Sequence, residues 1–414
     1  MTTAQPRQDP LTRYAKLTAA GPIHRARRLD GSTLWVITRA AEARVALADP
    51  RLRMRPPAGG GPEVPSGIPA RYLFPYQDHL AVMDPPDHTL LRRLVSATFT
   101  PRRVEALRPR IQEITDGLLD GLDGRGEADL IQELALPLPI AVIGELLGIP
   151  EQRRAEFRDW ADTIVGANPE QDQATLGERQ AALDHLYDYL TGLIADKRRQ
   201  PGEDLLSALT EAAEDEQKLT DGQLLSMSFL LLVAGYETTA GLIANSVLAL
   251  LSAPGRLAAL RAEPALLPGA VEELLRHCGP VDKANNRFAV EEIRIGAAVI
   301  QPGDQVQVAL TAANRDPRAF DADPGELDLR RGDGSRHLAF GHGIHYCLGA
   351  RLAKAEAEIA IGTLLGRFGE LEVAVPVDEL PWRVAPLLHD VRQLPVRLSP
   401  RSTVEGRPAE SWDG

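Results

Sequence analysis

Apolar residues recur along most of this chain at the spacing of an amphipathic α-helix, and polar or Pro/Gly-rich breaks separate the helical segments. The most apolar segment, residues 224–251, predicts a long buried helix. Another apolar-periodic helix is expected directly after Cys347. Short apolar segments at 34–38, 294–300 and 306–310 predict β-strands. The pattern therefore predicts a mainly α protein with small β-sheets.

Three breaks in this pattern predict loops. Residues 56–69 are rich in Pro and Gly and lack apolar periodicity. Loops of that length are commonly functional or mobile. A polar stretch at 167–175 separates two helical patterns, and a charged stretch at 214–218 precedes the long apolar helix.

Composition narrows the class of protein. The chain has 414 residues, of which 44% are hydrophobic and 25% charged, as is ordinary for a globular protein. Two cysteines and no signal-like N-terminus favour a reducing cytoplasm over a disulfide framework. The best apolar run, 229–235, is too short to span a membrane. A net charge of −12 argues against a nucleic-acid partner.

The segment from Phe340 to the glycine at 349 carries the chemistry of the chain, and its letters are FGHGIHYCLG. Cys347 stands where a helix begins, and a thiolate there is stabilised by the macrodipole and free backbone N–H groups. The glycines at 341 and 343 let the backbone pass close to a large flat group, and Gly349 lets it lie close after the ligand. His345 could bind an anionic group beside a metal.

These residues resemble the pattern F-G-x-G-x-[H/R]-x-C-x-G of the cytochrome P-450 superfamily, the heme-thiolate monooxygenases. The resemblance implies the fold of that family, with heme b between a long distal helix and the helix after the cysteine loop. It implies that Cys347 is the axial thiolate ligand of the iron, with Phe340 and Gly349 beside the cofactor. The alternative is zinc, because His342, His345 and Cys347 have ligand-like spacing. Zinc normally takes four ligands, and the other cysteine is far away in the sequence.

The long apolar helix contains a polar turn around Glu237. A core helix with threonines that bond back to the preceding turn would explain it. The run Ala234-Gly235-x-Glu237-Thr238-Thr239 also resembles the oxygen-activating motif of the family. The resemblance implies that Ala234 and Gly235 leave room for O2. It also implies that Thr238 hydrogen-bonds the bound oxygen and that Glu237 relays protons from solvent.

Four basic residues match the propionate contacts of the family: His88, Arg92, Arg287 and His345. The first two lie four residues apart and share a helix face, and propionates are natural anionic targets for them. An exposed basic face is the alternative for that pair.

Glu273 and Arg276 match the buried E-x-x-R pair, which is structural in this family. Glu326 stands where an arginine often completes this network. Arg330 or Arg331 is a candidate to replace that arginine.

The resemblance extends over residues 14–398 and implies a single domain, between a disordered N-terminus at 1–13 and a flexible tail at 399–414. It is strongest to bacterial enzymes that hydroxylate or epoxidise polyketides and macrolides in antibiotic biosynthesis. Oxidative coupling or rearrangement of another natural product, and heme binding without turnover, are alternatives. Substrate contacts are expected from Met83, Leu230, Ala234, Lys283, Asn285 and Leu387. Lys283 and Asn285 could instead face water and the propionates.

Electrons must come from another protein, because two cysteines cannot hold a four-cysteine cluster and no flavin motif is present. The resemblance implies a ferredoxin with an NAD(P)H ferredoxin reductase as partners, and a cytoplasmic monomer that uses O2. A basic face near the cysteine loop would receive the ferredoxin: Arg92, Arg93, Arg102, Arg103, Arg351 and Lys354. A solvated charged face is the alternative.

Overall fold

A computed structural model describes residues 10–28, 31–57, 78–96, 99–166, 173–214, 219–383 and 387–400. Residues 1–9 of the N-terminal segment predicted as disordered over 1–13, most of the loops at 56–69 and 167–175, and the tail beyond 400 lie outside the described residues. Residues 10–13 instead begin a helix (Pro10–Ala20) and residues 399–400 end a strand (Pro395–Pro400), so both predicted boundaries need correction.

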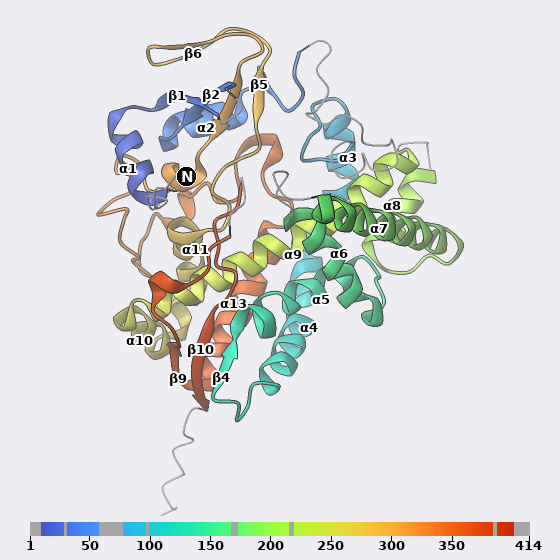
Figure 1. Ribbon diagram of the computed structural model, residues 1–414, viewed down its shortest axis with the longest axis vertical. Coiled ribbons are helices and arrows are strands. Elements are labelled where there is room, and N and C mark those ends of the chain that lie inside the picture. Colours follow the sequence, from blue (N-terminus) through green and yellow to red (C-terminus); the bar gives the residue numbers. More distant parts are fainter. Residues whose placement is uncertain are drawn as a thin grey trace, which may run out of the picture.

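Helix α9 (Asp221–Leu251) crosses the middle of the molecule, and helices surround it (Figure 1). Its start is fixed by a capping box, in which Thr220 and Gln223 each accept a hydrogen bond from the backbone N–H of the other. Of its most apolar window, 72% is buried inside the fold. Its length and apolarity would suit a membrane span, but burial explains them as a core helix.

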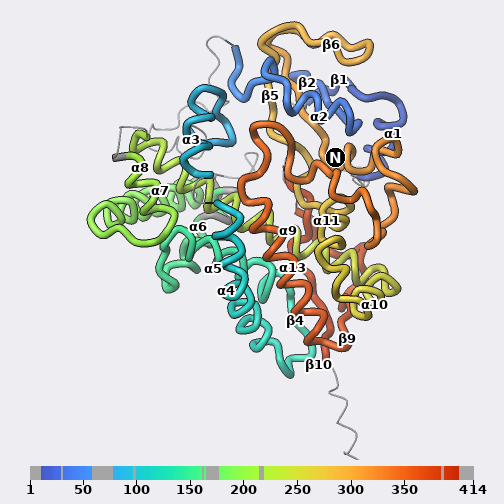
Figure 2. Tube along the Cα trace, turned by 180° about the vertical axis from the view of Figure 1, so that it is seen from behind, coloured from blue at the N-terminus to red at the C-terminus, as the bar shows by residue number. Residues whose placement is uncertain are grey.

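The helices packed directly against α9 are α5 (Pro137–Leu146), α7 (Gln173–Arg199), α8 (Leu205–Glu214), α10 (Pro254–Ala262), α11 (Leu267–Cys278) and α13 (Ala350–Arg367). Helix α4 (Pro101–Asp120) packs against α13, which is seen best from behind (Figure 2), and α6 (Arg154–Gly166) packs against α7. The shorter helices are α1 (Pro10–Ala20), α2 (Ala40–Ala48), α3 (Asp87–Ser96) and α12 (Leu310–Ala313). The prediction of a mainly α fold is confirmed.

Three small sheets flank the helices. The largest has the strand order β1-β2-β8-β5-β3, formed by β1 (Ile23–Arg27), β2 (Thr33–Ile37), β8 (Gln305–Val308), β5 (Arg287–Ala289) and β3 (Leu52–Arg53). A second sheet joins β4 (Glu127–Asp129), β10 (Pro395–Pro400) and β9 (Phe368–Val373). The third is the hairpin of β6 (Ile293–Ile295) and β7 (Ala298–Ile300).

Two of the strand predictions need correction. The segment 294–300 is a hairpin instead of one strand, because Gly296 takes a φ of 59° and turns the chain. The strand predicted at 306–310 ends at Val308, and α12 begins at Leu310. The strand predicted at 34–38 is confirmed as β2, shifted by one residue.

Candidate active site

The cysteine loop joins a 3-10 turn (Gly343–His345) to α13, and Gly349 is the residue before that helix. A backbone hydrogen bond from Cys347 N–H to the Phe340 carbonyl, 2.9 Å long, closes the loop. Solvent reaches the Cys347 side chain, yet burial raises the pKa of its thiol, so the sulfur opens into an interior space. Backbone N–H groups at Gly349 and Ala350 and the nearby Arg92 charge oppose that rise, and all three favour a thiolate.

Backbone conformation and packing also explain why glycines stand at two positions of this loop. Gly341 and Gly343 take φ values of 73° and 75°, which L side chains rarely adopt. A Cβ on Gly343 would lie 2.7 Å from the Leu47 carbonyl oxygen of α2. Its small size is therefore required by the packing of the loop on α2, not by the approach of a flat group alone.

The structure brings the four predicted propionate contacts together. The His88 and His345 rings lie 4.4 Å apart. Burial first, and then the charges of His88, Arg287 and Arg92, lower the pKa of His345 to about 3. Burial lowers the pKa of Arg287 to about 10, and burial and Arg92 lower the pKa of His88.

Burial disfavours the charged form of all three groups, and neighbouring cationic groups add to that effect at the two histidines. His88 Nε2 is buried and has no hydrogen-bond partner among the described residues. Arg287 donates to the Leu47 carbonyl at 2.9 Å. A dianionic group would supply both the missing charge and the missing acceptor, so these residues fit the propionates of a heme.

One face of α9 is reached by solvent although the helix is otherwise largely buried. Leu230, Ala234 and Thr238, each four residues apart, are partly or fully exposed along it. Thr238 donates a hydrogen bond of 2.9 Å to the Ala234 carbonyl, as the alternative of a core helix with back-bonding threonines requires. The exposure of these side chains indicates an interior space on this face of the helix.

Gly235 has a packing role that the sequence did not show. An added Cβ would lie 2.9 Å from Cγ1 of Ile143 in α5, so its missing side chain makes room for α5. That Ala234 and Gly235 also leave space for O2 stays a prediction.

Glu237 takes part in an ionic network that the sequence pattern did not reveal. Arg383 Nη1 donates to Glu237 Oε1 at 2.9 Å. Arg383 Nε lies 2.9 Å from Asp390 Oδ1, close enough for an ion pair although it lacks the alignment of a hydrogen bond. Burial raises the pKa of Asp390, and Arg383 opposes the rise. Glu237 and Arg383 lie 146 positions apart in the sequence and no periodic pattern links them, so only the fold could reveal this pair.

The Glu273–Arg276 pair is buried as predicted, with Arg276 Nε 2.6 Å from Glu273 Oε2. Arg331 completes the network: its Nε lies 3.1 Å from Glu273 Oε1, and it donates to the Asp323 carbonyl. Arg330 instead pairs with Glu263 on the surface. Of the two candidates, Arg331 replaces the arginine missing at 326.

The segments predicted to face substrate meet in space. Asn285 Nδ2 donates to the Ala81 carbonyl at 3.3 Å, and the Asp282 N–H donates to the Leu387 carbonyl at 2.8 Å. Met83 is only 2% exposed and packs in the main core. The Lys283 ammonium lies 3.4 Å from Asp282 Oδ2, and Tyr14 of α1 bonds the same oxygen. The ion pair with Asp282 favours the alternative in which Lys283 does not contact substrate.

The chain matches the cytochrome P450 family over residues 172–381. It is 48% identical to cytochrome P450 107B1 of Saccharopolyspora erythraea over 94% of this chain and 95% of that protein. It is 47% identical to the cytochrome P450 monooxygenase PikC of Streptomyces venezuelae, over 94% and 91% of the two chains.

Solved structures are similar too. The tirandamycin C-bound monooxygenase TamI superposes with a TM-score of 0.83 at 40% identity, over 95% of this chain and 98% of that one. CxnD, a cytochrome P450 for C–S bond formation in chuangxinmycin biosynthesis, gives 0.85 at 36% identity, over 95% of each chain. The chain therefore belongs to the cytochrome P450 family and is a monooxygenase that carries heme b with an axial cysteine thiolate.

Proposed function

We propose that Cys347 is the axial ligand and that this enzyme inserts one oxygen atom from O2 into a C–H or C=C bond of a polyketide or macrolide. The observation that carries the assignment is a sulfur in an interior space beside a cluster of two arginines and two histidines, of which Arg287 and His88 are buried. A relative solved with tirandamycin C bound and a relative named 6-deoxyerythronolide B hydroxylase support the substrate class. The bound heme supplies the iron that activates O2.

The residues of this chain hold the cofactor and handle protons in this proposal. Arg92, Arg287, His88 and His345 bind the propionates, whose negative charge offsets the burial that lowers the pKa of each of these groups. Glu237 takes protons from solvent and passes them toward Thr238, whose hydroxyl hands them to the distal side of the heme. Arg383 holds the Glu237 carboxylate in place by a hydrogen bond to Oε1.

The ferrous–CO spectrum of the purified protein tests the ligand. Wild type should give the red-shifted Soret band of thiolate-ligated heme. Cys347→His should lose that band while it retains heme, and Cys278→Ser should keep it, because Cys278 ends α11 and its thiol donates to the Leu274 carbonyl of the same helix. A red-shifted band in Cys347→His would contradict the assignment. Spin-state titration with a macrolide and polyketide library then identifies the substrate class.

Oxidative bond formation is the second candidate reaction, favoured by the similarity to CxnD. Isotope-labelled O2 separates the two, because only oxygen insertion leaves the label in the product.

Reduction by a ferredoxin completes the proposal, in a cytoplasmic monomer. Arg93, Arg102, Arg103 and Arg351 are exposed, whereas Lys354 is already paired with Glu272 at 2.8 Å. The four exposed arginines would therefore attract an acidic ferredoxin more than Lys354 does, and reduction rates should fall with salt.

A further inference from the structure

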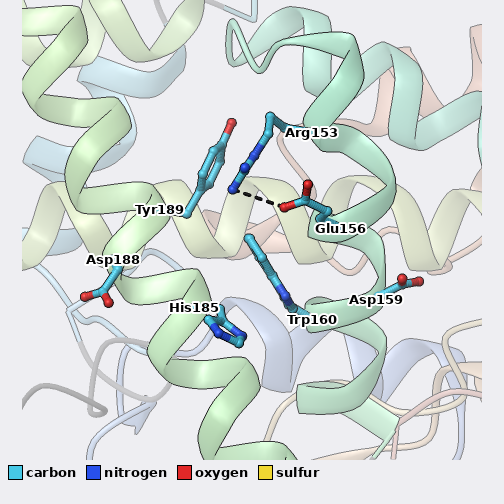
Figure 3. A pocket seen from close by; sticks show the side chains of 7 residues that line it. All are labelled: Arg153, Glu156, Asp159, Trp160, His185, Asp188 and Tyr189. Atoms are coloured by element: carbon cyan, nitrogen blue, oxygen red, sulfur yellow. Dashed lines mark ion pairs between the residues drawn. The ribbon is translucent and has the colours of Figure 1, made fainter.

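A solvent-open pocket in the described part of the chain is not part of the site above. It lies between α6 and α7, has a volume of about 530 Å³ and opens to solvent (Figure 3). The Trp160 and Tyr189 rings face it, with centroids 5.9 Å apart, and His185 stacks on Trp160 at 5.6 Å. None of these residues has a part in the proposed chemistry.

The pocket combines aromatic faces with an excess of negative charge. Glu156, Asp159 and Asp188 line it and Arg153 is its one arginine, so three carboxylates meet one guanidinium, an excess of two negative charges. Aromatic faces attract cations through the ring quadrupole, and carboxylates strengthen that attraction. The combination suits an organic cation.

The protein already places a cation in this position. The Arg153 guanidinium lies 5.2 Å from the Tyr189 ring centroid and 5.9 Å from that of Trp160, and it is 3.1 Å from Glu156 (Figure 3). The side chains of Arg153 and Glu156 are 44% and 48% exposed, so solvent screening leaves their ion pair weak. Arg153 can therefore swing into water at little cost.

The environment of the Tyr189 hydroxyl favours displacement of the Arg153 side chain from the pocket. The Tyr189 hydroxyl is buried and has no hydrogen-bond partner in the part of the chain that the structure describes. Buried hydroxyls without partners are destabilising. A rearrangement that moves Arg153 away and lets water or a ligand reach this hydroxyl would remove that penalty.

We propose that this pocket is an effector site for an organic cation, a protonated tertiary amine or a quaternary ammonium ion with an apolar body. The ammonium group takes the place of the Arg153 guanidinium between Trp160 and Tyr189, beside Glu156. Its apolar body fills the open part of the pocket.

A buried ring connects this pocket to the helix of the active site. Phe157 is 2% exposed, and its ring centroid lies 6.5 Å from that of Trp160 and 6.4 Å from that of Tyr189. Its other side forms, with Leu232 and Tyr236 of α9, a crevice too narrow to admit a water molecule. Tyr236 directly precedes Glu237. Close packing transmits displacements, so a ligand that moves Trp160 and Tyr189 also biases this turn of α9.

The test uses the holoenzyme labelled with 5-fluorotryptophan and observed by fluorine NMR. The chain has four tryptophans, so the Trp160 resonance can be assigned by its absence in Trp160→Phe. The probe is choline, and the control is its uncharged isostere 3,3-dimethylbutan-1-ol. We expect choline to shift the Trp160 resonance saturably and the alcohol to leave it unchanged. An equal response to both, or no saturable response to choline, would overturn the proposal.

Two variants and one matched control sharpen this test. Arg153→Ala should tighten choline binding by about threefold or more, because it removes the competing cation. Tyr189→Leu should weaken choline binding by a similar factor.

The matched control is Arg199→Ala. Like Arg153, Arg199 is an exposed arginine in an i,i+3 ion pair, in its case with Asp196 on α7. It stands ten residues, or about 15 Å, from Tyr189, beyond the Debye length of about 8 Å in physiological salt. Equal effects of Arg153→Ala and Arg199→Ala would exclude displacement from the aromatic rings. Unshifted Trp35 and Trp382 resonances show that a variant is folded.

The link to α9 has its own readout, the dissociation constant of a spin-shifting ligand of the heme site. Saturating choline should change this constant by about twofold or more in wild type, and the same concentration of 3,3-dimethylbutan-1-ol should leave it unchanged. An unchanged constant in wild type would overturn the effector role.

Discussion

Thr238 is the residue on which the oxygen chemistry depends most directly. Its hydroxyl is the one polar side-chain group on the solvent-reached stripe of Leu230, Ala234 and Thr238. We expect Thr238→Ala to keep heme and substrate binding, because only the hydrogen bond to the Ala234 carbonyl is lost. Proton delivery loses its last donor, so more peroxide should form per NAD(P)H consumed. The peroxide yield measures this, with Thr239→Ser as the control. Unchanged coupling in Thr238→Ala would remove its hydroxyl from the mechanism.

Arg383 matters as the counter-charge of two buried carboxylates. Arg383→Gln leaves Glu237 and Asp390, 5% and 2% exposed, without a cation between them. Removal of one partner from a buried ionic network costs about 3–5 kcal/mol of unfolding free energy. Urea unfolding of the holoenzyme measures the loss. Addition of Asp390→Asn should restore part of it, and no recovery in the double variant would contradict this account.

At the scale of elements, the approach of α5 to α9 depends on Gly235. Gly235→Ala places a methyl group 2.9 Å from Ile143 Cγ1, and such overpacking costs about 1–3 kcal/mol. A thermal melt should show the loss, and Gly235→Ala should cost less in an Ile143→Ala background than in wild type, because the contact atoms are then removed.

Gly117 in α4 provides the matched control for that prediction. An added Cβ there meets no heavy atom within 4 Å, so Gly117→Ala should be neutral or stabilising by about 0.5–1 kcal/mol. If both alanine substitutions destabilise equally, helix packing does not explain Gly235.

The hydrophobic pattern predicted the long helices but not the shortest strands. The apolar period predicted α9 and α13 correctly, since each buries a broad face that the sequence displays directly. Strands of three or two residues, such as β3 and β4, have too few positions to show a period, and their pairing partners lie far away in the sequence. The hairpin of β6 and β7 was merged into one strand for the same reason.

For the whole molecule, the network of Glu273 ties several distant segments together. Arg276 donates to the carbonyls of Asn314 and Pro324, and Arg331 reaches the same carboxylate. Glu273→Gln leaves two buried guanidinium groups without a counter-charge, and we expect a loss of about 3–5 kcal/mol in unfolding free energy. Chemical unfolding of the holoenzyme measures it.

Glu263→Gln is the control, because Glu263 also pairs with an arginine, Arg330, but on the surface. It should hardly change stability. A similar loss in both variants would mean that burial of the Glu273 network is not what makes it matter.

The buried His277 gives the molecule an acid sensitivity. Burial, and then the charge of Arg315 and other arginines, lowers the pKa of His277 to about 3 from its usual 6.5. Between these values the unfolded chain binds a proton that the folded chain does not, so stability falls as pH falls below 6.5. His277→Gln should flatten this slope by up to about 1.4 kcal/mol per pH unit. Unfolding at pH 7.0 and 5.5 tests it, and parallel slopes would contradict it.

The sequence by itself determined the family, the cysteine loop and the helical core, because each depends on residues that are close in the sequence. The patterns are a ten-residue motif, an i,i+4 pair and an apolar period. It also named the four basic residues that the structure brings together. It left open which of Arg330 and Arg331 completes the Glu273 network.

Tertiary structure decided the rest, since contacts between distant segments leave no local pattern. It paired Arg383 with Glu237, turned Lys283 toward Asp282 and gave Gly235 and Gly343 their packing roles. It also closed Arg153, Trp160 and Tyr189 around one pocket, with residues from two helices whose spacing along the chain gives no sign of it.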